Sequence, residues 1–333
     1  MDLEKYINRS KSNDKEIWLH NLPNDKNLFD VIDNLRRQYN KFEYTFVINQ
    51  EIRITGITID SDVDFSNCIF KNEEEIENSG NIQIEPSIIF NKVKFKGIVD
   101  FSNTSLYGIK FENVDFIGEG KNIFFKNSSL YDDIKFKNVN FNFSTHFNNS
   151  EIEKLYFEGT TFRGNTNFRE ISFNGETKFL NCTFTSLQND TSEEVSFSGS
   201  TFKQKVEFLE SKFQIKTSFS YFEKKDELRL EATNFERDAI FSNCTFGQSN
   251  IEEKSISSID FSNAKFNQKV KFSFSTFNSE VIFKNTKFKD LLYFHKVDFY
   301  QPTQFHFTDF TKKAFFSNTH FFKEIQFFIS VYQ

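Results

Sequence analysis

Several residue types that commonly shape globular enzymes are nearly missing from this sequence. Its 333 residues include 3 Pro, 11 Gly, 1 Trp and 1 Met, beside 49 Phe. Such an uneven composition points away from an ordinary enzyme. The length alone would allow two domains.

The sequence also lacks a strong net charge and long apolar runs, and its number of cysteines is odd. The formal net charge of -6 is mild, so neither direct nucleic-acid binding nor an anionic membrane is favoured. No apolar run approaches the roughly 18 residues of a membrane span. The charged start MDLEKYINRSKSNDKEIW does not resemble a secretory signal, and three widely spaced cysteines fit a reducing compartment. We therefore expect a cytoplasmic protein without a membrane span.

What the sequence does have is a regular spacing of phenylalanine. From residue 261 onward, large apolar residues are separated by alternating steps of 5 and 6 residues without a miss. They are Phe261, Phe266, Phe272, Phe277, Phe283, Phe288, Phe294, Phe299, Phe305, Phe310, Phe316, Phe321 and Phe327. The position two residues before each of them is mostly small or β-branched, as at Ala264, Val270 and Val281, and the other positions are mainly polar.

This spacing predicts a chain that turns a corner after every unit. A residue and the one two positions before it lie on the same side of an extended strand, so each unit is a very short strand with two inward side chains. An α-helix would scatter the rings around its axis, and a long flat strand would reverse their direction after each odd step. Four corners after 5, 6, 5 and 6 residues close a coil of 22 residues, and such coils stack about 4.8 Å apart.

The pattern resembles that of pentapeptide-repeat proteins, and the alternating steps are similar to a Phe-rich subfamily of them. That family has an all-β fold, a right-handed four-sided β-helix in which the central Phe or Leu and the residue two before it point inward. The resemblance covers roughly residues 48–327. Following the ladder back to Ile48 gives about eleven coils, which predicts a rod roughly 50 Å long.

The ladder is interrupted at five places, which we expect to be loops at corners of the coil. They lie near residues 71–85, 117–122, 185–193, 220–227 and 247–257. Near residue 224 the ladder supplies Lys224 where a large apolar residue is due and continues at Leu230, which predicts a bulge or short loop. When faces are numbered 1 to 4 from Phe90, the other four interruptions fall between faces 2 and 3 or between faces 4 and 1. Insertions are therefore expected at these two corners alone.

Residues 1–45 do not follow the ladder and are expected to form a small helical cap on a β-helix of residues 46–333. In NLFDVIDNLRRQYNKF, Leu28, Ile32, Leu35 and Tyr39 fall on one helix face, with Asn27 as the N-cap. A cap is needed because an open β-helix end exposes unpaired backbone and ring faces. The opposite end, FFKEIQFFISVYQ, has no helix after it, so we expect either a partner there or a longer natural chain.

The sequence contains no catalytic or metal-binding constellation. Cys68, Cys182 and Cys244 all occupy the small inward position, where a thiol fills space much like Ala or Val. His320 lies one coil after Asp298, but no nucleophile or ligand completes that column, so a surface pair is the better interpretation. No phosphate-binding loop, nucleophile elbow or zinc spacing is present. We expect no catalytic residue, no cofactor and no metal, and therefore no enzyme.

Two kinds of outward residue are candidates for contact with a partner, and two faces have a distinct surface chemistry. Paired acids in the interruptions either contact a basic partner or are solvated loop tips; they are Glu73, Glu74, Glu75, Glu193, Glu194, Glu252 and Glu253. Extra outward aromatics near the C-terminus suggest a contact surface; they are Tyr293, Tyr300, Phe315, Phe322 and Phe328. Face 2 is expected to be basic, through Lys94, Lys96, Arg163, Lys212, Lys265, Lys287 and Lys289. Face 4 is expected to be rich in hydroxyl groups, through Ser105, Ser129, Ser172, Thr201, Thr245 and Thr276.

These features favour a non-catalytic repeat scaffold that mediates protein–protein interaction. The partners we expect are an unidentified protein and a second copy of the chain, which would form a homodimer through the C-terminal coils. The resemblance offers two alternatives. Some pentapeptide-repeat proteins mimic duplex DNA and act on DNA gyrase or topoisomerase, but mimicry needs a long acidic face spaced like phosphates, and the acids here are scattered. Related Phe-rich members are often fused to membrane segments, so the chain could be the soluble part of a membrane-associated protein.

Overall fold

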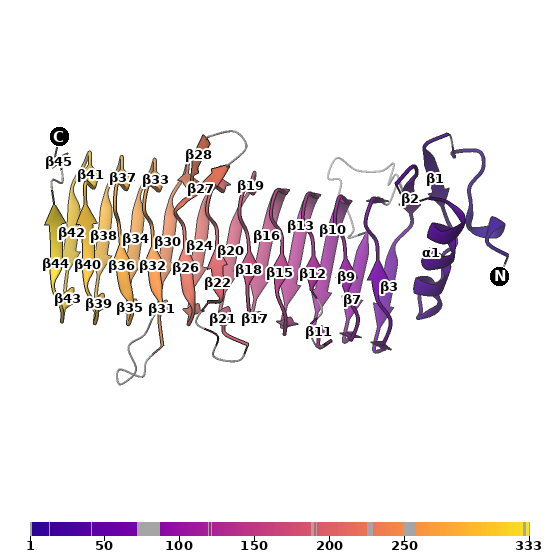
Figure 1. Cartoon of the computed structure of the whole chain (residues 1–333), viewed down its shortest axis with the longest axis horizontal. Helices are drawn as coiled ribbons and strands as arrows, with labels where there is room; N and C mark the ends of the chain where they lie inside the picture. The colour runs from indigo at the N-terminus through magenta and orange to yellow at the C-terminus, as the bar shows by residue number, and fades with distance from the viewer. Residues whose placement is uncertain are drawn as a thin grey trace, which may run out of the picture.

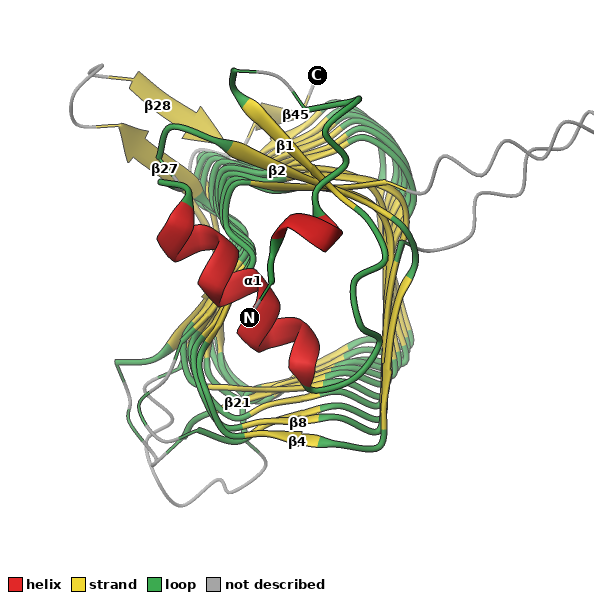
Figure 2. Cartoon of the chain, turned by 90° about the vertical axis from the view of Figure 1, so that its right-hand side faces the viewer, coloured by secondary structure: helices red, strands yellow, loops and turns green. Residues whose placement is uncertain are grey.

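The computed structural model describes residues 2–12, 14–40, 42–71, 87–118, 120, 122–187, 190, 192–224, 229–248, 257–328 and 331–332. These residues form a rod of short strands, and the two ends of the chain lie at opposite ends of the rod (Figure 1). Seen along its axis the rod is four-sided, with one strand of each coil on each side (Figure 2). The fold is therefore the right-handed four-sided β-helix that the spacing and the resemblance predicted.

The strands form four faces, numbered from the strand that contains Phe90, and pair in parallel from coil to coil. Face 1 consists of β3 (Ile52–Thr55), β7 (Ile88–Asn91), β20 (Thr177–Leu180), β24 (Val206–Leu209), β30 (Ala239–Ser242), β34 (Val270–Ser273), β38 (Leu292–His295) and β42 (Ala314–Ser317). Face 4 consists of β1 (Glu16–Leu19), β2 (Thr45–Asn49), β6 (Cys68–Lys71), β19 (Ser172–Phe173), β23 (Thr201–Phe202), β29 (Asn234–Phe235), β33 (Lys265–Phe266), β37 (Lys287–Phe288), β41 (Asp309–Phe310) and β45 (Val331–Tyr332). Three longer strands turn the corner from face 4 onto face 1; they are β10 (Ser105–Glu112), β13 (Ser129–Lys137) and β16 (Glu151–Glu158). These two faces therefore form one sheet of 21 strands.

The other two faces are separate sheets of 11 strands each, which confirms the expected number of coils. Face 2 consists of β4 (Thr58–Ile59), β8 (Lys94–Phe95), β11 (Asp115–Phe116), β14 (Asn140–Phe141), β17 (Thr161–Arg163), β21 (Thr183–Thr185), β25 (Lys212–Phe213), β31 (Thr245–Phe246), β35 (Thr276–Phe277), β39 (Asp298–Phe299) and β43 (His320–Phe321). Face 3 consists of β5 (Val63–Asp64), β9 (Val99–Asp100), β12 (Ile123–Phe124), β15 (Thr145–His146), β18 (Thr166–Asn167), β22 (Glu194–Ser196), β26 (Lys216–Ser218), β32 (Ser258–Asp260), β36 (Glu280–Ile282), β40 (Thr303–His306) and β44 (Ile325–Phe328).

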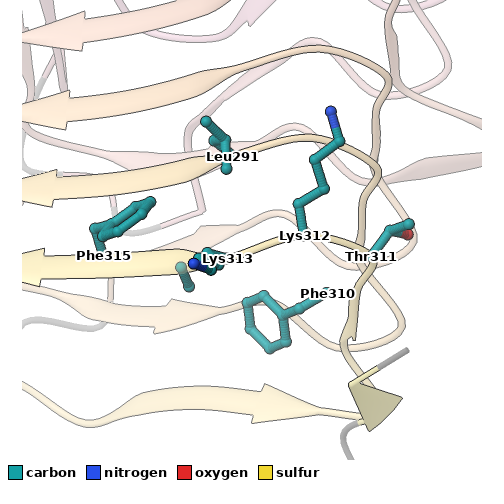
Figure 3. Close-up of a pocket in the computed structure, with 7 residues that line it drawn as sticks. Leu291, Phe310, Thr311, Lys312, Lys313 and Phe315 are labelled. Atoms are coloured by element: carbon teal, nitrogen blue, oxygen red, sulfur yellow. The ribbon is translucent and has the colours of Figure 1, made fainter.

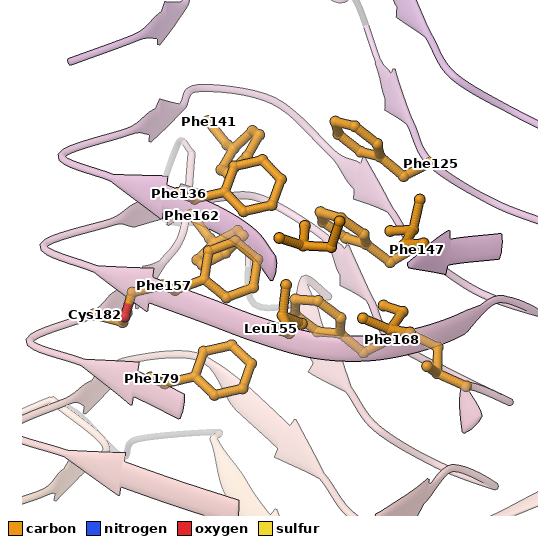
Figure 4. Packing of buried hydrophobic residues seen from close by; sticks show 14 of the residues in the cluster. Phe125, Phe136, Phe141, Phe147, Leu155, Phe157, Phe162, Phe168, Phe179 and Cys182 are labelled. Atoms are coloured by element: carbon orange, nitrogen blue, oxygen red, sulfur yellow. The ribbon is translucent and has the colours of Figure 1, made fainter. Parts of the chain in front are cut away.

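The inward phenylalanines form continuous ring stacks along the rod (Figure 4). On face 1 the ring centroids of Phe136 and Phe157 are 4.7 Å apart in a stacked arrangement. Rings from neighbouring faces meet edge to face, as Phe136 and Phe147 do at 5.9 Å and 90°. Both geometries are favourable for aromatic pairs. Because the ladder residues from Ile48 to Phe310 are buried, and burying one Phe contributes roughly 1.5–3 kcal/mol, these stacks are the main source of stability.

Two of the four corners are closed by a residue with left-handed backbone conformation in nearly every coil. This residue comes two positions after the inward residue of face 1, as at Asn138 (φ 52°) and Asn181 (φ 52°), and of face 3, as at Asn103 (φ 55°). Asn and Gly adopt this conformation at less cost than other residues. At the other two corners it occurs only at isolated described positions, such as Gly164 (φ 80°) and Asp132 (φ 60°). The corners therefore differ in kind, and the spacing of phenylalanine follows the difference: left-handed corners lie in the five-residue steps, as at Asn285 and Lys296, and the other two corners mostly take six residues.

The interruption near residue 224 is a β-hairpin, and it shifts the predicted faces of everything after it. Strands β27 (Tyr221–Lys224) and β28 (Arg229–Ala232) pair antiparallel and project from the corner between faces 3 and 4 (Figure 2). The prediction that Leu230 continues the ladder is wrong, because Phe235 resumes it on face 4, paired with Phe202. A hairpin returns to the corner that it left and adds no face to the coil, whereas the spacing alone counted its residues as two strands.

The prediction that insertions occur at two corners alone is also wrong, because this hairpin uses a third corner. The spacing assigned the connection between β31 and β32 to the corner between faces 4 and 1. In the structure β31 is on face 2 and β32 on face 3, so this connection belongs to the corner between faces 2 and 3. It joins the connections between β11 and β12 and between β21 and β22 there. Three of the long connections thus leave the rod along one edge.

The N-terminal helix α1 (Asn27–Gln38) lies across the open end of the first coil (Figure 2). Leu28, Ile32 and Leu35 are buried against the core, as the sequence predicted. Asn27 is not the N-cap; it is the first helical residue, and its side-chain Nδ2 donates to Asp25 Oδ2 at 3.1 Å. The other oxygen of Asp25 accepts the backbone N–H of Asn27 at 2.8 Å, so this carboxylate holds the start of the helix.

The cap is not purely helical, because strand β1 extends face 4 beyond the first coil. It pairs with β2 in parallel, from Glu16 opposite Thr45 to Leu19 opposite Ile48, and a short 3-10 helix, Glu4–Tyr6, precedes it. The division of the chain between residues 45 and 46 stays a prediction, and β2 spans that point.

Candidate functional site

The three cysteines are free and buried, as predicted. All occupy the small inward position, and Cys182 Sγ donates to the carbonyl oxygen of Phe157 at 3.6 Å. Burial raises the pKa of Cys68, Cys182 and Cys244 to about 12 in each case. A nucleophilic or metal-binding thiol needs exposure and a lowered pKa, so these thiols are suited to packing alone.

The paired His320 and Asp298 lie on the outside of face 2, in register on neighbouring coils. His320 Nδ1 is 2.8 Å from Asp298 Oδ1, with 65% and 38% of the two side chains exposed. Thr276 lies one coil before Asp298 in the same column. An exposed pair of this kind contributes little. Within the described part of the chain no three His, Cys, Asp or Glu side chains gather into a metal-binding group.

Of the predicted acidic contacts, the structure describes Glu193 and Glu194, while Glu73–Glu75, Glu252 and Glu253 lie outside the described residues. Glu193 is buried, and its Oε2 accepts the backbone N–H of Leu187 at 2.8 Å. Glu194 is in strand β22, where it forms an ion pair with Arg169 and lies 3.1 Å from Lys216 Nζ. Both carboxylates are therefore already engaged by their own chain.

The outward aromatics of the C-terminal coils lie on different sides of the rod. Tyr293 and Phe315 stack at 5.0 Å on face 1, and Tyr300 and Phe322 stack at 4.6 Å after the strands of face 2. Phe328 lies at the end of face 3 and contacts Phe307 edge to face at 5.6 Å. The predicted contact surface is thus three small aromatic stacks, not one continuous patch. Their exposure is substantial, at 56% for both Phe322 and Phe328.

The face shift after the hairpin corrects the predicted surface chemistry. Lys265, Lys287 and Lys289 belong to face 4 and the corner after it, so face 2 is not a continuous basic face. Thr245 and Thr276 belong to face 2, so the hydroxyl column of face 4 ends at Thr201. Both errors have one cause, which is the hairpin that the spacing counted as two strands.

Six lysines gather on the coils after the hairpin, and the corrected faces change the side of the rod on which they lie but not their grouping. They surround the corner between faces 4 and 1 on three consecutive coils, and we call them the lysine corner: Lys265, Lys269, Lys271, Lys287, Lys289 and Lys313. A hollow of about 740 Å³ adjoins this corner (Figure 3). Its lining includes Leu291, Phe310, Lys312 and Phe315, so apolar side chains and ammonium groups meet there.

The geometry agrees with a comparison of the sequence with protein families. A family model for pentapeptide repeats, built on nine copies, matches residues 125–170 and 261–306. The chain contains pentapeptide repeats. No curated protein and no solved structure matches it.

The two segments that match the pentapeptide-repeat model are stretches of the rod with little interruption. Each spans two coils or slightly more, from Phe125 to beyond Phe168 and from Phe261 to Phe305. The segments between and around them contain the hairpin and most of the long connections. Among the described helices, none has both the length and the apolar character that crossing a bilayer requires.

Proposed function

We propose that this protein is a non-catalytic scaffold that binds another protein through outward side chains of its C-terminal coils. The observation that carries the proposal is the exposure of aromatic rings there. Strands β38 and β39, which present Tyr293 and Tyr300, pair in parallel on both sides, and the strands that present Phe315 and Phe322 pair with them from the last described coil. Exposed aromatic rings on a rigid backbone are well suited to protein contacts, because they bury a large area and lose little side-chain entropy.

An affinity experiment with the full chain tests this function. Immobilised protein is exposed to a lysate of its own host, and retained proteins are quantified for the wild type and for a Phe322→Ser, Phe328→Ser variant. Phe42→Ser is the matched control, because Phe42 is 82% exposed and lies in the N-terminal cap. We expect one host protein to be retained by the wild type and the control and lost from the double variant. Equal retention by all three, or no specific retention, contradicts the proposal.

A symmetric dimer through the C-terminal coils is part of the same proposal. The last described coil exposes 40% of Phe316 and 48% of Phe327, both of which are ladder rings. Two-fold pairing would cover these rings and is the commonest closed assembly. Light scattering at tens of micromolar should then give twice the chain mass of 39.5 kDa. A monodisperse monomer contradicts the dimer, and a dimer that persists in the Phe322→Asp, Phe328→Asp variant places the contact elsewhere.

DNA mimicry finds less support from the surface. A mimic of duplex DNA needs a continuous acidic face. The outward column of face 2 places Lys94 beside Asp115, and further along it Lys212 lies between Thr183 and Thr245. A gyrase supercoiling assay is the direct test. Inhibition of gyrase that persists in the Phe322→Ser, Phe328→Ser variant would favour mimicry.

A further inference from the structure

We propose that the lysine corner binds an acidic segment of a protein partner through its carboxylates. The proposal rests on the scaffold function and gives it a surface and a partner chemistry. The lysines belong to three successive coils, through β33 and β34, β37 and β38, and β41 and β42. Because successive coils are about 4.8 Å apart, the corner is about 10 Å tall, which suits a short extended segment.

Few carboxylates adjoin the lysine corner, and among the described residues none forms an ion pair with its six lysines. Asp309 lies opposite Lys287 in the parallel register, and Asp290 is paired with Lys312. Elsewhere on the same sheet lysines are paired, as Lys110 is with Glu112 at 3.0 Å and Lys135 with Asp133 at 2.6 Å. Lys265 and Lys287 lie directly opposite each other in the parallel register. Like charges in that position destabilise a sheet, and carboxylates from outside would relieve the repulsion.

Asp290, one of two aspartates beside the corner, shows how a carboxylate behaves there. Asp290 Oδ1 is 2.9 Å from Lys312 Nζ. The hydrogen bond from Lys312 lowers the pKa of Asp290, and the backbone N–H of Leu291 and the charges of Lys312 and Lys269 act in the same direction. The surroundings thus favour an ionised carboxylate, which is the group that an incoming Asp or Glu would bring.

Charge is also divided between the sides of the rod in these coils. Residues 257–328 contain ten Lys and six Asp or Glu. Only Asp290 and Asp309 lie on the side of faces 4 and 1. The others lie on faces 2 and 3 or at the corner between them, and they are Asp260, Glu280, Asp298 and Glu324. This division directs an acidic partner to the lysine corner and away from the opposite side.

The chemistry of the surface favours a polypeptide over a nucleic acid. Residues 257–328 contain no arginine, the side chain whose planar fork matches phosphate best. The adjoining hollow has Leu291, Phe310 and Phe315 in its lining (Figure 3). A peptide carries carboxylates and an apolar side chain for such a hollow on one short chain.

The test uses the full chain and a fluorescein-labelled ten-residue peptide that alternates glutamate and serine. Fluorescence anisotropy measures binding in about 20 mM and about 150 mM NaCl. At the higher salt the Debye length shortens to about 8 Å, which weakens attraction between exposed charges. The variant is Lys287→Glu with Lys289→Glu. The matched control is Lys94→Glu with Lys212→Glu, which makes the same charge change at two exposed lysines of face 2. Circular dichroism checks that both double variants fold. If the Lys287→Glu, Lys289→Glu variant does not fold, Lys271→Glu with Lys313→Glu replaces it.

We expect the wild type to bind the peptide, with affinity falling at the higher salt. Binding should weaken about tenfold or more in the lysine-corner variant and less than about twofold in the control. Three results overturn the proposal: no binding to the wild type, equal weakening in both variants, or tighter binding of a single-stranded oligonucleotide of the same charge. The scaffold function fails separately. If the host protein is retained by the lysine-corner variant as by the wild type, the scaffold stands and this surface does not.

Discussion

In the middle of the rod each buried ring lies between two copies of itself, whereas the contacts of the N-terminal cap occur once. Phe272 stacks on Phe241 at 4.7 Å and on Phe294 at 5.1 Å, and the same arrangement recurs along all four faces. In the cap, Phe29 meets Phe65 at 6.0 Å. The middle is therefore stabilised by repetition, while the cap depends on individual contacts.

The most elaborate of those individual contacts is made by Arg36. Its side chain is 5% exposed and lies 3.2 Å from Asp64 Oδ1. Its guanidinium also donates to the carbonyl oxygen and the hydroxyl of Ser66, at 2.7 and 3.0 Å. One residue of the helix thus ties the cap to the first turn of face 3. The comparison teaches that a repeat fold can need non-repeating chemistry where its repetition begins.

The largest effect is expected from breaking the repetition itself. Phe272→Ala should lower the free energy of unfolding by about 3–5 kcal/mol, because it opens a cavity between two stacked rings. Chemical denaturation measures the change, with the exposed neighbour Lys271→Ala as the control. A loss no greater than that of the control would contradict the inward placement of Phe272.

A smaller effect is expected from breaking the cap. Arg36→Ala should cost about 1–3 kcal/mol, because Asp64 and Ser66 lose a charged hydrogen-bond partner. Hydrogen exchange should show the loss in β5 and β6 before the middle coils. Arg37→Ala on the same helix is the control, since Arg37 is 75% exposed and forms an exposed pair with Asp33, and it should cost less than about 0.5 kcal/mol. Similar losses of unfolding free energy for the two variants would show that the contacts of Arg36 with Asp64 and Ser66 do not stabilise the cap.

A third prediction separates the two kinds of corner. Asn181 has φ 52°, so Asn181→Ala should cost about 1 kcal/mol, while Asn181→Gly should be near neutral. Asn142, at the corner between faces 2 and 3, is not among the positive-φ residues, and Asn142→Ala should change stability less. Thermal unfolding of the three variants is sufficient. Equal losses at the two asparagines would show that backbone conformation does not decide what a corner tolerates.

Near neutral pH, where folded and unfolded thiols are both mostly protonated, the smallest effect concerns the cysteines. Because burial raises their pKa to about 12, a thiol reagent at pH 8 should modify none of the three cysteines rapidly. Above the ordinary thiol pKa of 9.0, unfolded chains lose these protons and folded ones do not, so stability should fall between pH 9 and about 12. In the Arg36→Ala variant, Cys68 should react before Cys182 and Cys244. Simultaneous labelling of all three would contradict local opening of the cap.

What could be predicted from the sequence is what repeats. The ladder from Ile48 to Phe310, the inward cysteines and the face of α1 all follow from spacing, because periodic burial leaves a periodic record. The left-handed corners also leave such a record, in Asn103, Asn138 and Asn181 and in the five-residue steps in which they lie. The hairpin and strand β1 leave no periodic pattern in the sequence, because each occurs once. Their backbone hydrogen bonds are made to strands that only the folded chain brings alongside.

The candidate surfaces were predictable only as far as the faces were. Tyr293 and Phe315 share a face because they are 22 residues apart, which spacing gives directly. Spacing alone groups the lysines of the lysine corner but puts them on the wrong side of the rod, because the hairpin moves Lys265 and Lys287 together from face 2 to face 4. Engagement of Glu194 by Arg169 and Lys216 depends on side chains from three coils, which no linear pattern specifies.

Parallel pairing at a fixed interval has a further consequence, which concerns how such a chain can change its length. Phe272 pairs with Phe294, and Ser273 with His295, so removal of residues 273–294 would join Phe272 to His295 with every later side chain still facing as before. Removal of half that stretch would exchange opposite sides of the rod, and removal of one residue would turn later inward rings to solvent. The core of this molecule therefore tolerates changes of length in half or whole coils, and only whole coils also preserve the outward faces. Internal deletions of 22 residues should fold, whereas deletion of one residue should cause aggregation.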